Sequence, residues 1–309
     1  MTTLSMSKIV AAMLLWAACF PLITIGIALA PHLSFATLRA VVAGLALVGL
    51  ALALGRPFPR GRKTWGALGV MGIGATSLGF LGMFHAAEFV SPGLATVIAN
   101  TQPLLAAGLG SVVLGERLQP MGKAGLLVGF LGIVVIAAPR LLAGGEGSYL
   151  IGVAYIVLAA FGITISNVTI KKIAGQIDPL MAMGVQFLIG SIPLGIAAGM
   201  TEDVTSIQWS VTFIFVLLAL SLFGSALVYV LWMSVLARVP LYKANAFSFL
   251  VPVFGLTMGM LFFGETLGPL KLFGILLAVI GVVMVSRQGM AARPDAGLQQ
   301  PVPNLSRSW

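Results

Sequence analysis

The sequence predicts an all-α polytopic membrane protein with ten transmembrane helices, which form two inverted five-helix repeats. Of its 309 residues, 59% are hydrophobic and only 8% are charged, a composition far outside the range of soluble proteins. The apolar runs are about 20 residues long, the length at which a helix crosses the hydrocarbon layer of a bilayer. The chain also repeats itself, because a shift of 149 positions (265 − 116) places Pro103 on Pro252 and Gly115-Glu116 on Gly264-Glu265.

This repeat defines the domain organisation. Each copy contains an apolar helix interrupted by proline, a Gly-Glu turn closed by Pro120 or Pro269, and an apolar helix with a glycine stripe. We assign residues 1–140 to the first five-helix repeat, residues 141–287 to the second and residues 288–309 to a disordered cytoplasmic tail rich in Pro, Gln and Ser. Because five is an odd number, the second repeat crosses the membrane upside down, which is the plan of many secondary transporters.

The ten helices follow from apolar runs that are separated by Gly, Pro and charged residues. The first run resembles a signal peptide, since Lys8 precedes it and Ala28-Leu29-Ala30 follows it. Its length and Pro21 argue against cleavage, and its removal would leave the first repeat one helix short. We place the helices at residues 7–28, 34–54, 64–88, 92–114, 121–138, 149–170, 179–199, 209–236, 241–263 and 269–286.

The basic residues predict the orientation. They lie in short loops between apolar runs and not on a folded basic face, so the net charge of +9 indicates membrane topology and not a nucleic-acid partner. With the N-terminus inside, only Arg140 and Lys271 fall on the outer side, which predicts a multi-pass protein of the cell inner membrane with both termini cytoplasmic. The cytoplasmic segments hold Lys8, Arg56, Arg60, Arg62, Lys63, Arg117, Lys123, Lys171, Lys172, Arg238, Lys243, Arg287, Arg293 and Arg307.

The repeated segment carries a family resemblance. With its second copy, it is similar to the EamA-type branch of the drug/metabolite transporter superfamily. The resemblance extends from Lys8 to about Arg287 and implies two inverted halves around a cavity lined by the first, third, fourth, sixth, eighth and ninth helices. Among the branches, the chain resembles bacterial amino-acid exporters, including those for aromatic amino acids. The residues that carry the resemblance are Ala87, Ala95, Pro103, Gly115, Glu116, Arg117, Leu118, Pro120, Gly125 and Gly132.

Prolines inside the predicted helices are candidate hinges. Pro103 and Pro252 interrupt the fourth and ninth helices at matching positions, and Pro21 lies in the first helix. A proline removes a backbone hydrogen bond of the helix. Each is therefore either a static kink that neighbouring helices stabilise or a hinge beside the cavity.

Three ionisable residues are candidates for a charge or proton role. Arg39 either snorkels to the outer surface or pairs with a substrate carboxylate in the cavity. A shift of 147 (186 − 39) places it on Gln186, so both residues are expected to stabilise the same contact between helices in each half. His85 lies one turn before Glu88, either as an interfacial residue or with Glu88 as the proton-carrying pair. The first helix has no carboxylate that could carry a proton in antiport, so facilitated diffusion is the alternative to proton-driven transport.

Polar and aromatic residues within the helices are the candidate substrate contacts. Unpaired polar groups in hydrocarbon are costly, so these residues either line the cavity or bond neighbouring helices. Two tryptophans lie away from the membrane boundaries, where indole walls would suit aromatic or aliphatic amino acids. The candidates are Trp16, His85, Asn100, Gln102, Asn167, Ser225, Tyr229, Trp232, Asn245 and Ser248.

A stripe of small residues marks the fifth and tenth helices. Small residues let helix backbones approach closely, so the stripe packs either within the chain or at a homodimer contact. Glu116 and Glu265 lie in turns at the membrane edge and are expected to cap helix ends or fix loops. The stripe comprises Gly122, Gly125, Gly129, Gly132, Gly274, Ala278 and Gly281.

These features predict a secondary transporter that exports small metabolites by alternating access. Amino acids, in particular aromatic or hydrophobic ones, are the expected substrates, and the lipid bilayer is the other partner. The alternatives are a carrier of the same fold for sugar or nucleotide-type cargo and an intramembrane enzyme. The chain lacks Gly-x-Ser-x-Gly, His-Glu-x-x-His and a Gly-rich phosphate loop, and its single cysteine, Cys19, cannot build a metal site. We therefore expect no enzymatic activity, no metal and no cofactor.

Overall fold

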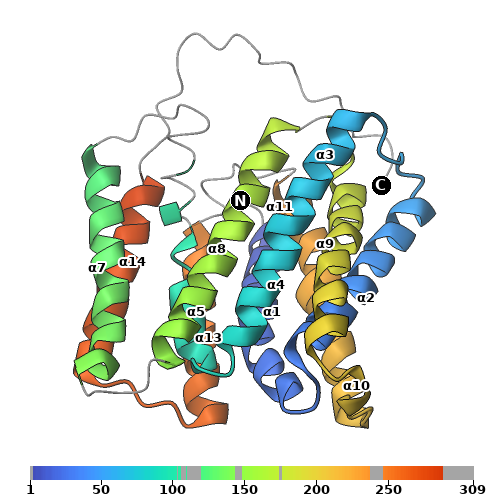
Figure 1. The fold of residues 1–309 in the computed structure, drawn as a ribbon. Helices are drawn as coiled ribbons and strands as arrows, with labels where there is room; N and C mark the ends of the chain where they lie inside the picture. The colour runs from blue at the N-terminus through green and yellow to red at the C-terminus, as the bar shows by residue number, and fades with distance from the viewer. Residues whose placement is uncertain are drawn as a thin grey trace.

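The computed structural model describes residues 3–102, 104, 105, 109, 120–142, 148–173, 176–236 and 246–287. Within these ranges the chain is helical and contains no β-strand, and the helices run side by side in one bundle (Figure 1). The helices are α1 (Thr3–Ile27), α2 (His32–Ala53), α3 (Arg62–Met71), α4 (Gly79–Ala86), α5 (Pro92–Ala99), α7 (Pro120–Leu142), α8 (Ser148–Lys172), α9 (Pro179–Thr201), α10 (Val211–Leu218), α11 (Val228–Leu236), α13 (Leu250–Phe263) and α14 (Pro269–Arg287). Two π-helical segments, η1 (Gly72–Leu78) and η3 (Ala219–Leu227), and two 3-10 segments, η2 (Val204–Ser206) and η4 (Ala246–Phe249), complete them.

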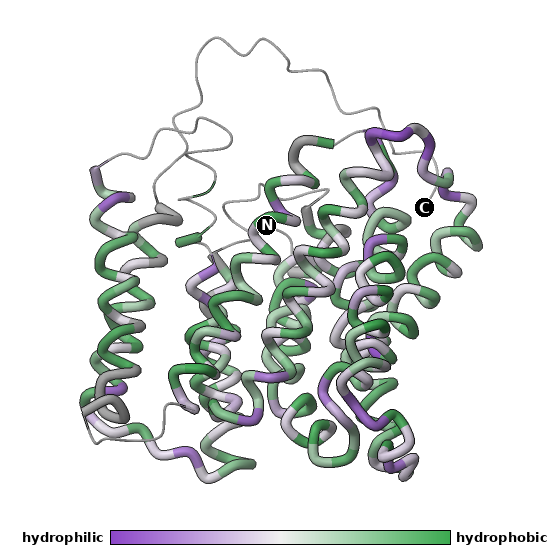
Figure 2. The backbone as a smooth tube through the Cα atoms, in the orientation of Figure 1, coloured by the Kyte–Doolittle hydropathy of each residue, from purple (hydrophilic) through white to green (hydrophobic). Residues whose placement is uncertain are grey.

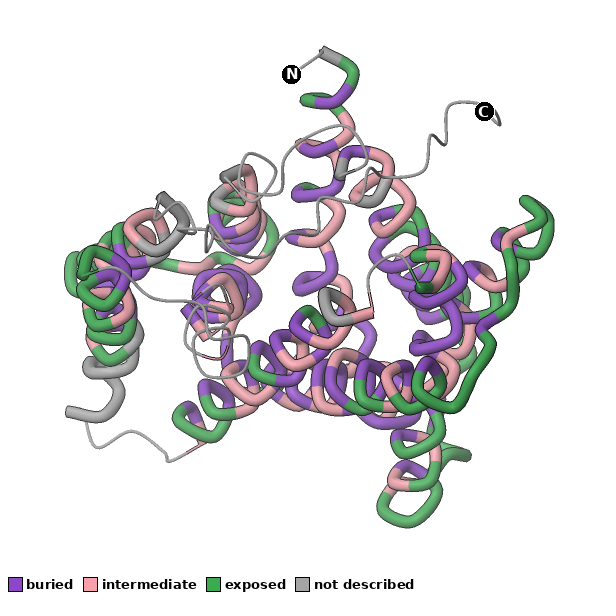
Figure 3. Tube along the Cα trace, turned by 90° about the horizontal axis from the view of Figure 1, so that it is seen from above, coloured by how far each residue is buried: buried purple, intermediate pink, exposed green. Residues whose placement is uncertain are grey.

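The composition of the helices is that of a polytopic membrane protein. Six stretches of the described chain are long and apolar enough to cross a membrane, and three shorter apolar helices accompany them. Many large hydrophobic residues are exposed, and Figure 3 shows that exposed residues lie at the outside of the bundle, where they would contact lipid. A hydrophilic stretch lies at the connection between α2 and α3 (Figure 2). The six stretches are Leu4–Ile27, His32–Ala53, Arg62–Ala86, Ser148–Ile170, Pro179–Thr201 and Val211–Trp232.

Two of the predicted helices differ from the expectation because a π-helical segment interrupts each of them. The predicted third helix is formed by α3, η1 and α4, and the predicted eighth by α10, η3 and α11. A π-helical turn widens the helix by one residue and is frequent at functional sites. In η1, a methyl group at Gly74 would lie 2.6 Å from the carbonyl oxygen of Gly162, so glycine is required where this segment touches α8.

The sequence predicts Pro252 in the middle of the ninth helix, but it lies near the start of α13. The 3-10 segment η4 ends at Phe249, and Pro252 is buried in the first turn of α13, where a missing N–H breaks no helical bond. At the matching place in the first half, α5 ends at Ala99 and a turn follows at Asn100 and Thr101. Pro103 itself lies outside the described residues, as do Asn245, Glu116 and the tail from residue 288.

Helices from the two halves of the chain pack against each other. α2 packs on α9, α5 on α13, and α7 on α14, which lie side by side in Figure 1. α1 packs on α11, η3 and α13, while α8 packs on α4, η1 and α5. The bundle is therefore built from contacts between segments that are far apart in the sequence.

The stripe of small residues packs within the chain, at the contact between α7 and α14. A methyl group at Gly281 would lie 2.5 Å from Cα of Gly129, and one at Gly132 would lie 2.5 Å from the backbone nitrogen of Ala278. The two backbones are close enough that only small side chains fit between them. Of the two alternatives for the stripe, the contact inside the chain is the one that the structure contains.

Carboxylates fix the helix ends. Glu265 accepts a hydrogen bond from the backbone N–H of Gly93 at 2.7 Å, so it caps the start of α5 as expected. The sequence did not reveal that Glu202 caps α2, where its oxygens accept 2.8 Å bonds from the backbone N–H groups of Leu33 and Ser34. Asp178 caps α9 through a 3.0 Å bond from the backbone N–H of Met181.

Candidate functional site

Arg39 is the centre of the candidate site. It belongs to α2, and its side chain is only 4% exposed. The guanidinium lies 4.5 Å from the centre of the Phe80 ring and 5.9 Å from that of Phe84, both on α4. Such distances are those of cation–π contacts. Because the side chain is enclosed between helices, the alternative that Arg39 snorkels to the surface is wrong.

The hydrogen bonds of Arg39 leave part of the guanidinium unpaired. Nε and Nη2 lie 3.3 and 3.2 Å from the hydroxyl oxygen of Ser225 in η3, to which they donate. Nη2 also lies 3.5 Å from the sulfur of Cys19 in α1. Nη1 is buried and has no hydrogen-bond partner among the residues that the structure describes. We call Arg39, Cys19, Phe80, Phe84 and Ser225 the guanidinium site.

An aromatic cluster begins at the guanidinium site. The Phe80 ring lies 5.8 Å from that of Phe187 on α9, and Phe187 lies 5.8 Å from Tyr229 on α11. Trp16 on α1 then contacts Tyr229 at 6.3 Å and Trp232 at 5.5 Å. These five rings form a continuous apolar and polarisable surface, within the centroid distances of favourable aromatic pairs.

A polar contact occupies the position equivalent to Arg39 in the second half. Gln186 of α9 is buried, and its side-chain oxygen accepts a 3.3 Å hydrogen bond from the hydroxyl of Thr76 in η1. Arg39 likewise bonds a hydroxyl, that of Ser225 in the π-helical segment η3. The expectation that Arg39 and Gln186 stabilise the same kind of interhelical contact is therefore confirmed.

His85 lies in a second cluster, beside a partner that the sequence did not indicate. Its ring stacks on that of His32 and lies near that of Tyr155, both at 5.1 Å between centroids. Nε2 of His32, and not His85, approaches the Glu88 carboxylate, at 3.8 Å. The expected pair of His85 and Glu88 is thus replaced by a set of three with His32. No group of three metal-binding side chains suited to an ion occurs in the described part of the chain.

The other predicted residues lie apart from the guanidinium site. Asn100 borders a narrow recess with Thr101 and Pro252, where the broken ends of the fourth and ninth helices meet. Gln102 and Ser248 are half-buried beyond these breaks, and Asn167 is exposed on α8. Pro21 is buried inside α1.

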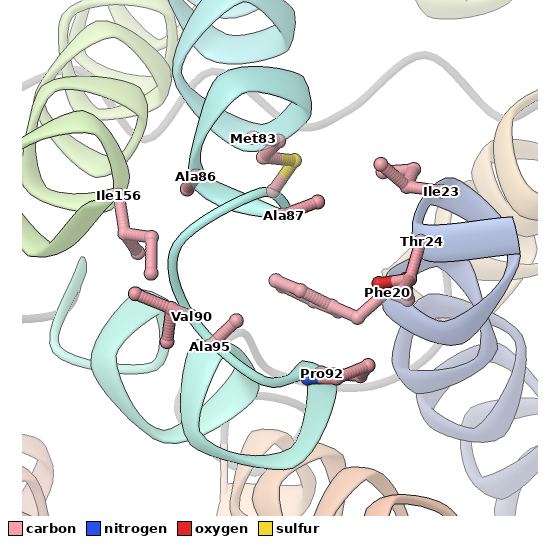
Figure 4. A pocket seen from close by; sticks show the side chains of 10 residues that line it. All are labelled: Phe20, Ile23, Thr24, Met83, Ala86, Ala87, Val90, Pro92, Ala95 and Ile156. Atoms are coloured by element: carbon pink, nitrogen blue, oxygen red, sulfur yellow. The ribbon is translucent and has the colours of Figure 1, made fainter. Parts of the chain in front are cut away.

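A small apolar pocket lies on another side of α1. Phe20 projects from α1 toward Val90 and Ala95, and Met83 and Ile156 close the remaining sides (Figure 4). The hydroxyl of Thr24, which also borders the pocket, donates to the backbone oxygen of Phe20. Because no charged side chain lines this pocket, it could bind a ligand only by burying apolar surface. The guanidinium site could in addition bind a negatively charged group.

Sequence reasoning missed three members of the guanidinium site, Cys19, Phe80 and Phe84, and one ring of the aromatic cluster, Phe187. In the sequence they are ordinary residues of apolar helices, and only the fold brings them to Arg39 and Tyr229. A signal was present in the spacing, because Ser225 and Tyr229 lie one helical turn apart and were both selected. Phe80 and Phe84 have the same one-turn spacing in α4, and this spacing could have marked them as aromatic residues that cover a cation.

Comparison with known proteins gives matches over nearly the whole chain. Residues 3–138 and 150–287 match the EamA-like transporter family. A WAT1-related chloroplast protein of Arabidopsis thaliana is 31% identical over 81% of this chain, which spans 62% of that protein. A "Probable amino-acid metabolite efflux pump" of Salmonella typhimurium is 31% identical over 69% of this chain and 74% of its own length. One crystal structure superposes with a TM-score of 0.64 at 21% identity, covering 92% of this chain and 96% of the other, which shows a shared fold.

Proposed function

We propose a function from one premise: the chain belongs to the EamA-like transporter family. The protein is a multi-pass membrane transporter that, in our proposal, exports small metabolites carrying a carboxylate, with amino acids as the first class to test. The observation that carries this proposal is the buried guanidinium of Arg39, whose Nη1 has no partner in the described part of the chain. The Salmonella relative, whose name refers to amino-acid metabolite efflux, supports the same class of substrate.

The chemistry of the site fits such a substrate. A guanidinium binds a carboxylate through short, charge-assisted hydrogen bonds, and Nη1 is available for one. The aromatic cluster of Phe80, Phe187, Tyr229, Trp16 and Trp232 would then contact an aromatic or aliphatic side chain by stacking and by area burial. In this proposal Ser225 and Tyr229 contact substrate from one face of the eighth helix.

The proposed architecture is ten helices in two inverted halves. If each helix is replaced by its equivalent in the other half, the contact of α1 with α11 becomes the contact of α8 with α4. The pairs α2 with α9, α5 with α13, and α7 with α14 stay the same pairs under this replacement. The π-helical segments η1 and η3 also exchange, as do the breaks after Ala99 and at η4. These equivalences support inverted repeats, whose two arrangements interconvert in alternating access.

The proposed motion opens the enclosed guanidinium site to one side at a time. The backbone contacts of α7 with α14 would hold these two helices together, since separating them would expose a closely packed glycine seam. Pro21 and the breaks near Pro103 and Pro252 are the proposed hinges, because discontinuous helices in corresponding positions are typical of transporter sites. Asn100, Gln102, Asn167, Asn245 and Ser248 are proposed to contact substrate during this motion.

A counterflow assay tests the proposed function. Purified protein is reconstituted into liposomes loaded with one unlabelled compound, and uptake of the labelled compound is measured for amino acids, their deaminated acids, sugars and nucleotides at two pH values. We expect carboxylate-bearing compounds with apolar side chains to exchange, and sugars without a carboxylate to be excluded. Uptake of sugars alone, or of no compound beyond protein-free liposomes, would contradict the proposal. Acceleration by a pH gradient would assign a proton role to His32, His85 and Glu88.

A further inference from the structure

Within the described residues, the membrane-spanning stretches carry one deeply placed charge and no carboxylate. None of the six long stretches or the three shorter apolar helices contains Asp or Glu. Arg39 is the eighth residue of the stretch His32–Ala53, whereas Lys8, Arg62 and Lys63 lie within the first five residues of theirs. Arg39 is therefore the one basic side chain of the six long stretches that is placed far from an end.

The acidic residues of the described chain contact other groups, at or near the ends of helices. Glu202 and Glu265 accept backbone hydrogen bonds at the starts of α2 and α5, and Asp178 does so at the start of α9. Glu88 is exposed beside His32, and Asp203 bonds Thr205 in an exposed turn. None of these five carboxylates contacts Arg39, and its partners among the described residues, Ser225, Cys19, Phe80 and Phe84, are neutral.

An uncompensated buried guanidinium costs several kcal/mol, and arginine cannot relieve this cost by losing its proton. A bound monoanion would neutralise the site, whereas a zwitterion brings an ammonium group with its carboxylate and leaves one positive charge in excess. We propose that the transported species is a net monoanion, an organic acid with one carboxylate and an apolar or aromatic body, and that the membrane potential drives its export. This inference rests on the proposed function and names the charge state of its substrate.

The charge of the site determines which step of the cycle responds to voltage. The loaded site is neutral, because the carboxylate balances Arg39, so its passage across the membrane moves no net charge. The empty site returns with one positive charge, and a potential that is negative inside pulls it toward the cytoplasm. One negative charge leaves the cell per cycle, which at equilibrium corresponds to an about 50-fold concentration ratio per 100 mV.

Two matched probes test the inference: 3-phenylpropionate and phenylalanine, which differ in the ammonium group alone. Efflux from proteoliposomes is measured at about neutral pH with a potassium diffusion potential set by valinomycin, and protein-free liposomes report passive leakage. We expect 3-phenylpropionate to bind more tightly than phenylalanine, and its net efflux to rise when the inside is made negative. Exchange with 3-phenylpropionate on both sides should not respond to potential, because the empty site never has to return.

Arg39→Gln should reverse this pattern, since its loaded site carries the charge of the substrate and its empty site carries none. The remaining exchange should then become sensitive to potential, while the surface variant Lys63→Gln should behave like the unaltered protein. Arg39→Lys keeps the charge and should keep potential-insensitive exchange, which separates loss of charge from loss of folding.

Three results would overturn the inference. They are a preference for phenylalanine, a net efflux of 3-phenylpropionate that ignores potential, and an efflux that follows a pH gradient instead. If neither probe moves and no other carboxylate exchanges in the counterflow panel, the proposed function fails as well. If phenylalanine exchanges and 3-phenylpropionate does not, the charge inference fails alone.

Discussion

Replacing Arg39 by glutamine is expected to lower the apparent affinity for a carboxylate substrate by about 100-fold. Charge-assisted hydrogen bonds contribute roughly 1.5–3 kcal/mol each, and 1.4 kcal/mol corresponds to a factor of ten. The measurement is the concentration dependence of counterflow in liposomes that contain equal amounts of each protein. The apparent affinity of Arg39→Lys should fall between those of the unaltered protein and Arg39→Gln. Lysine keeps the charge but loses the planar guanidinium that bonds Ser225 and stacks on Phe80.

The same variant separates a binding role from a structural one. Arg39→Gln loses the bonds that Nε and Nη2 donate to Ser225, but it also removes a buried charge that no described residue balances, so the thermal stability should be unchanged or higher. Gln186→Leu is the matched control, because it removes the equivalent contact to Thr76 without touching the charge. It should lower stability and leave carboxylate affinity nearly intact. Full transport by Arg39→Gln, or a loss of stability as large as its loss of affinity, would contradict the proposed site.

Gly281→Leu is expected to prevent α14 from packing against α7. Even a methyl group at this position would lie 2.5 Å from Cα of Gly129 and 2.6 Å from the carbonyl oxygen of Gly125, and neither backbone atom can move aside as a side chain would. Overpacking costs roughly 1–3 kcal/mol and occasionally more, and a collision between two backbones belongs at the upper end. The measurement is the yield of monodisperse protein in detergent together with its thermal unfolding temperature.

Gly49→Leu is the matched control for this prediction. Gly49 lies in α2, and an added methyl group there meets no atom within 4 Å. It replaces glycine by a better helix former in a helix that faces lipid, so stability should be unchanged or slightly higher. Equal behaviour of the two variants would show that the α7–α14 seam does not hold the fold together.

Much of the fold could be predicted from the sequence, because each apolar run had the length of a membrane span and ended at Gly, Pro or charge. Apart from α5 and α13, which are shorter than the predicted fourth and ninth helices, the described helices begin and end close to the predicted ranges, and the stripe of Gly129, Gly132 and Gly281 packs as a close helix contact. These are local properties of a chain, which periodicity and composition determine. The π-helical segments could not be predicted, because close contacts between helices accompany them: α9 and α8 approach Gly72 and Gly74 in η1, and Cys19 of α1 approaches Gly224 in η3.

The candidate site was predictable in part. The sequence indicates four of its residues as polar or aromatic side chains in apolar helices. Ser225 contacts Arg39, and Trp16, Tyr229 and Trp232 belong to the aromatic cluster next to it. Whether Arg39 reaches the surface or points inward could not be decided, since both directions are compatible with its position in the second helix. The answer depends on the side chains of other helices, here Phe80 and Ser225, whose positions are set by tertiary packing.

The histidine cluster illustrates the same limit. His32 and His85 fall in separate segments, so spacing gave no reason to join them, yet their rings stack at 5.1 Å. The contact arises because α2 begins where α4 ends, at the same end of the bundle. In the same way, Glu202 reaches the start of α2 from the end of α9. Contacts between helix ends depend on which helices are neighbours in the bundle, which a single sequence leaves open.

The inversion of the two halves is the central claim, and the sidedness of one pair of loops tests it most directly. Arg60, in the connection between α2 and α3, and Ser206, in the connection between α9 and α10, are exposed and occupy equivalent positions in the two halves. Cys19 is buried, so the unaltered protein should not react with a membrane-impermeant thiol reagent and serves as the control. We expect Ser206→Cys to be labelled in intact cells and Arg60→Cys to be labelled only after the membrane is opened. Labelling of both cysteines from the same side would contradict the inverted arrangement and, with it, the alternating-access mechanism.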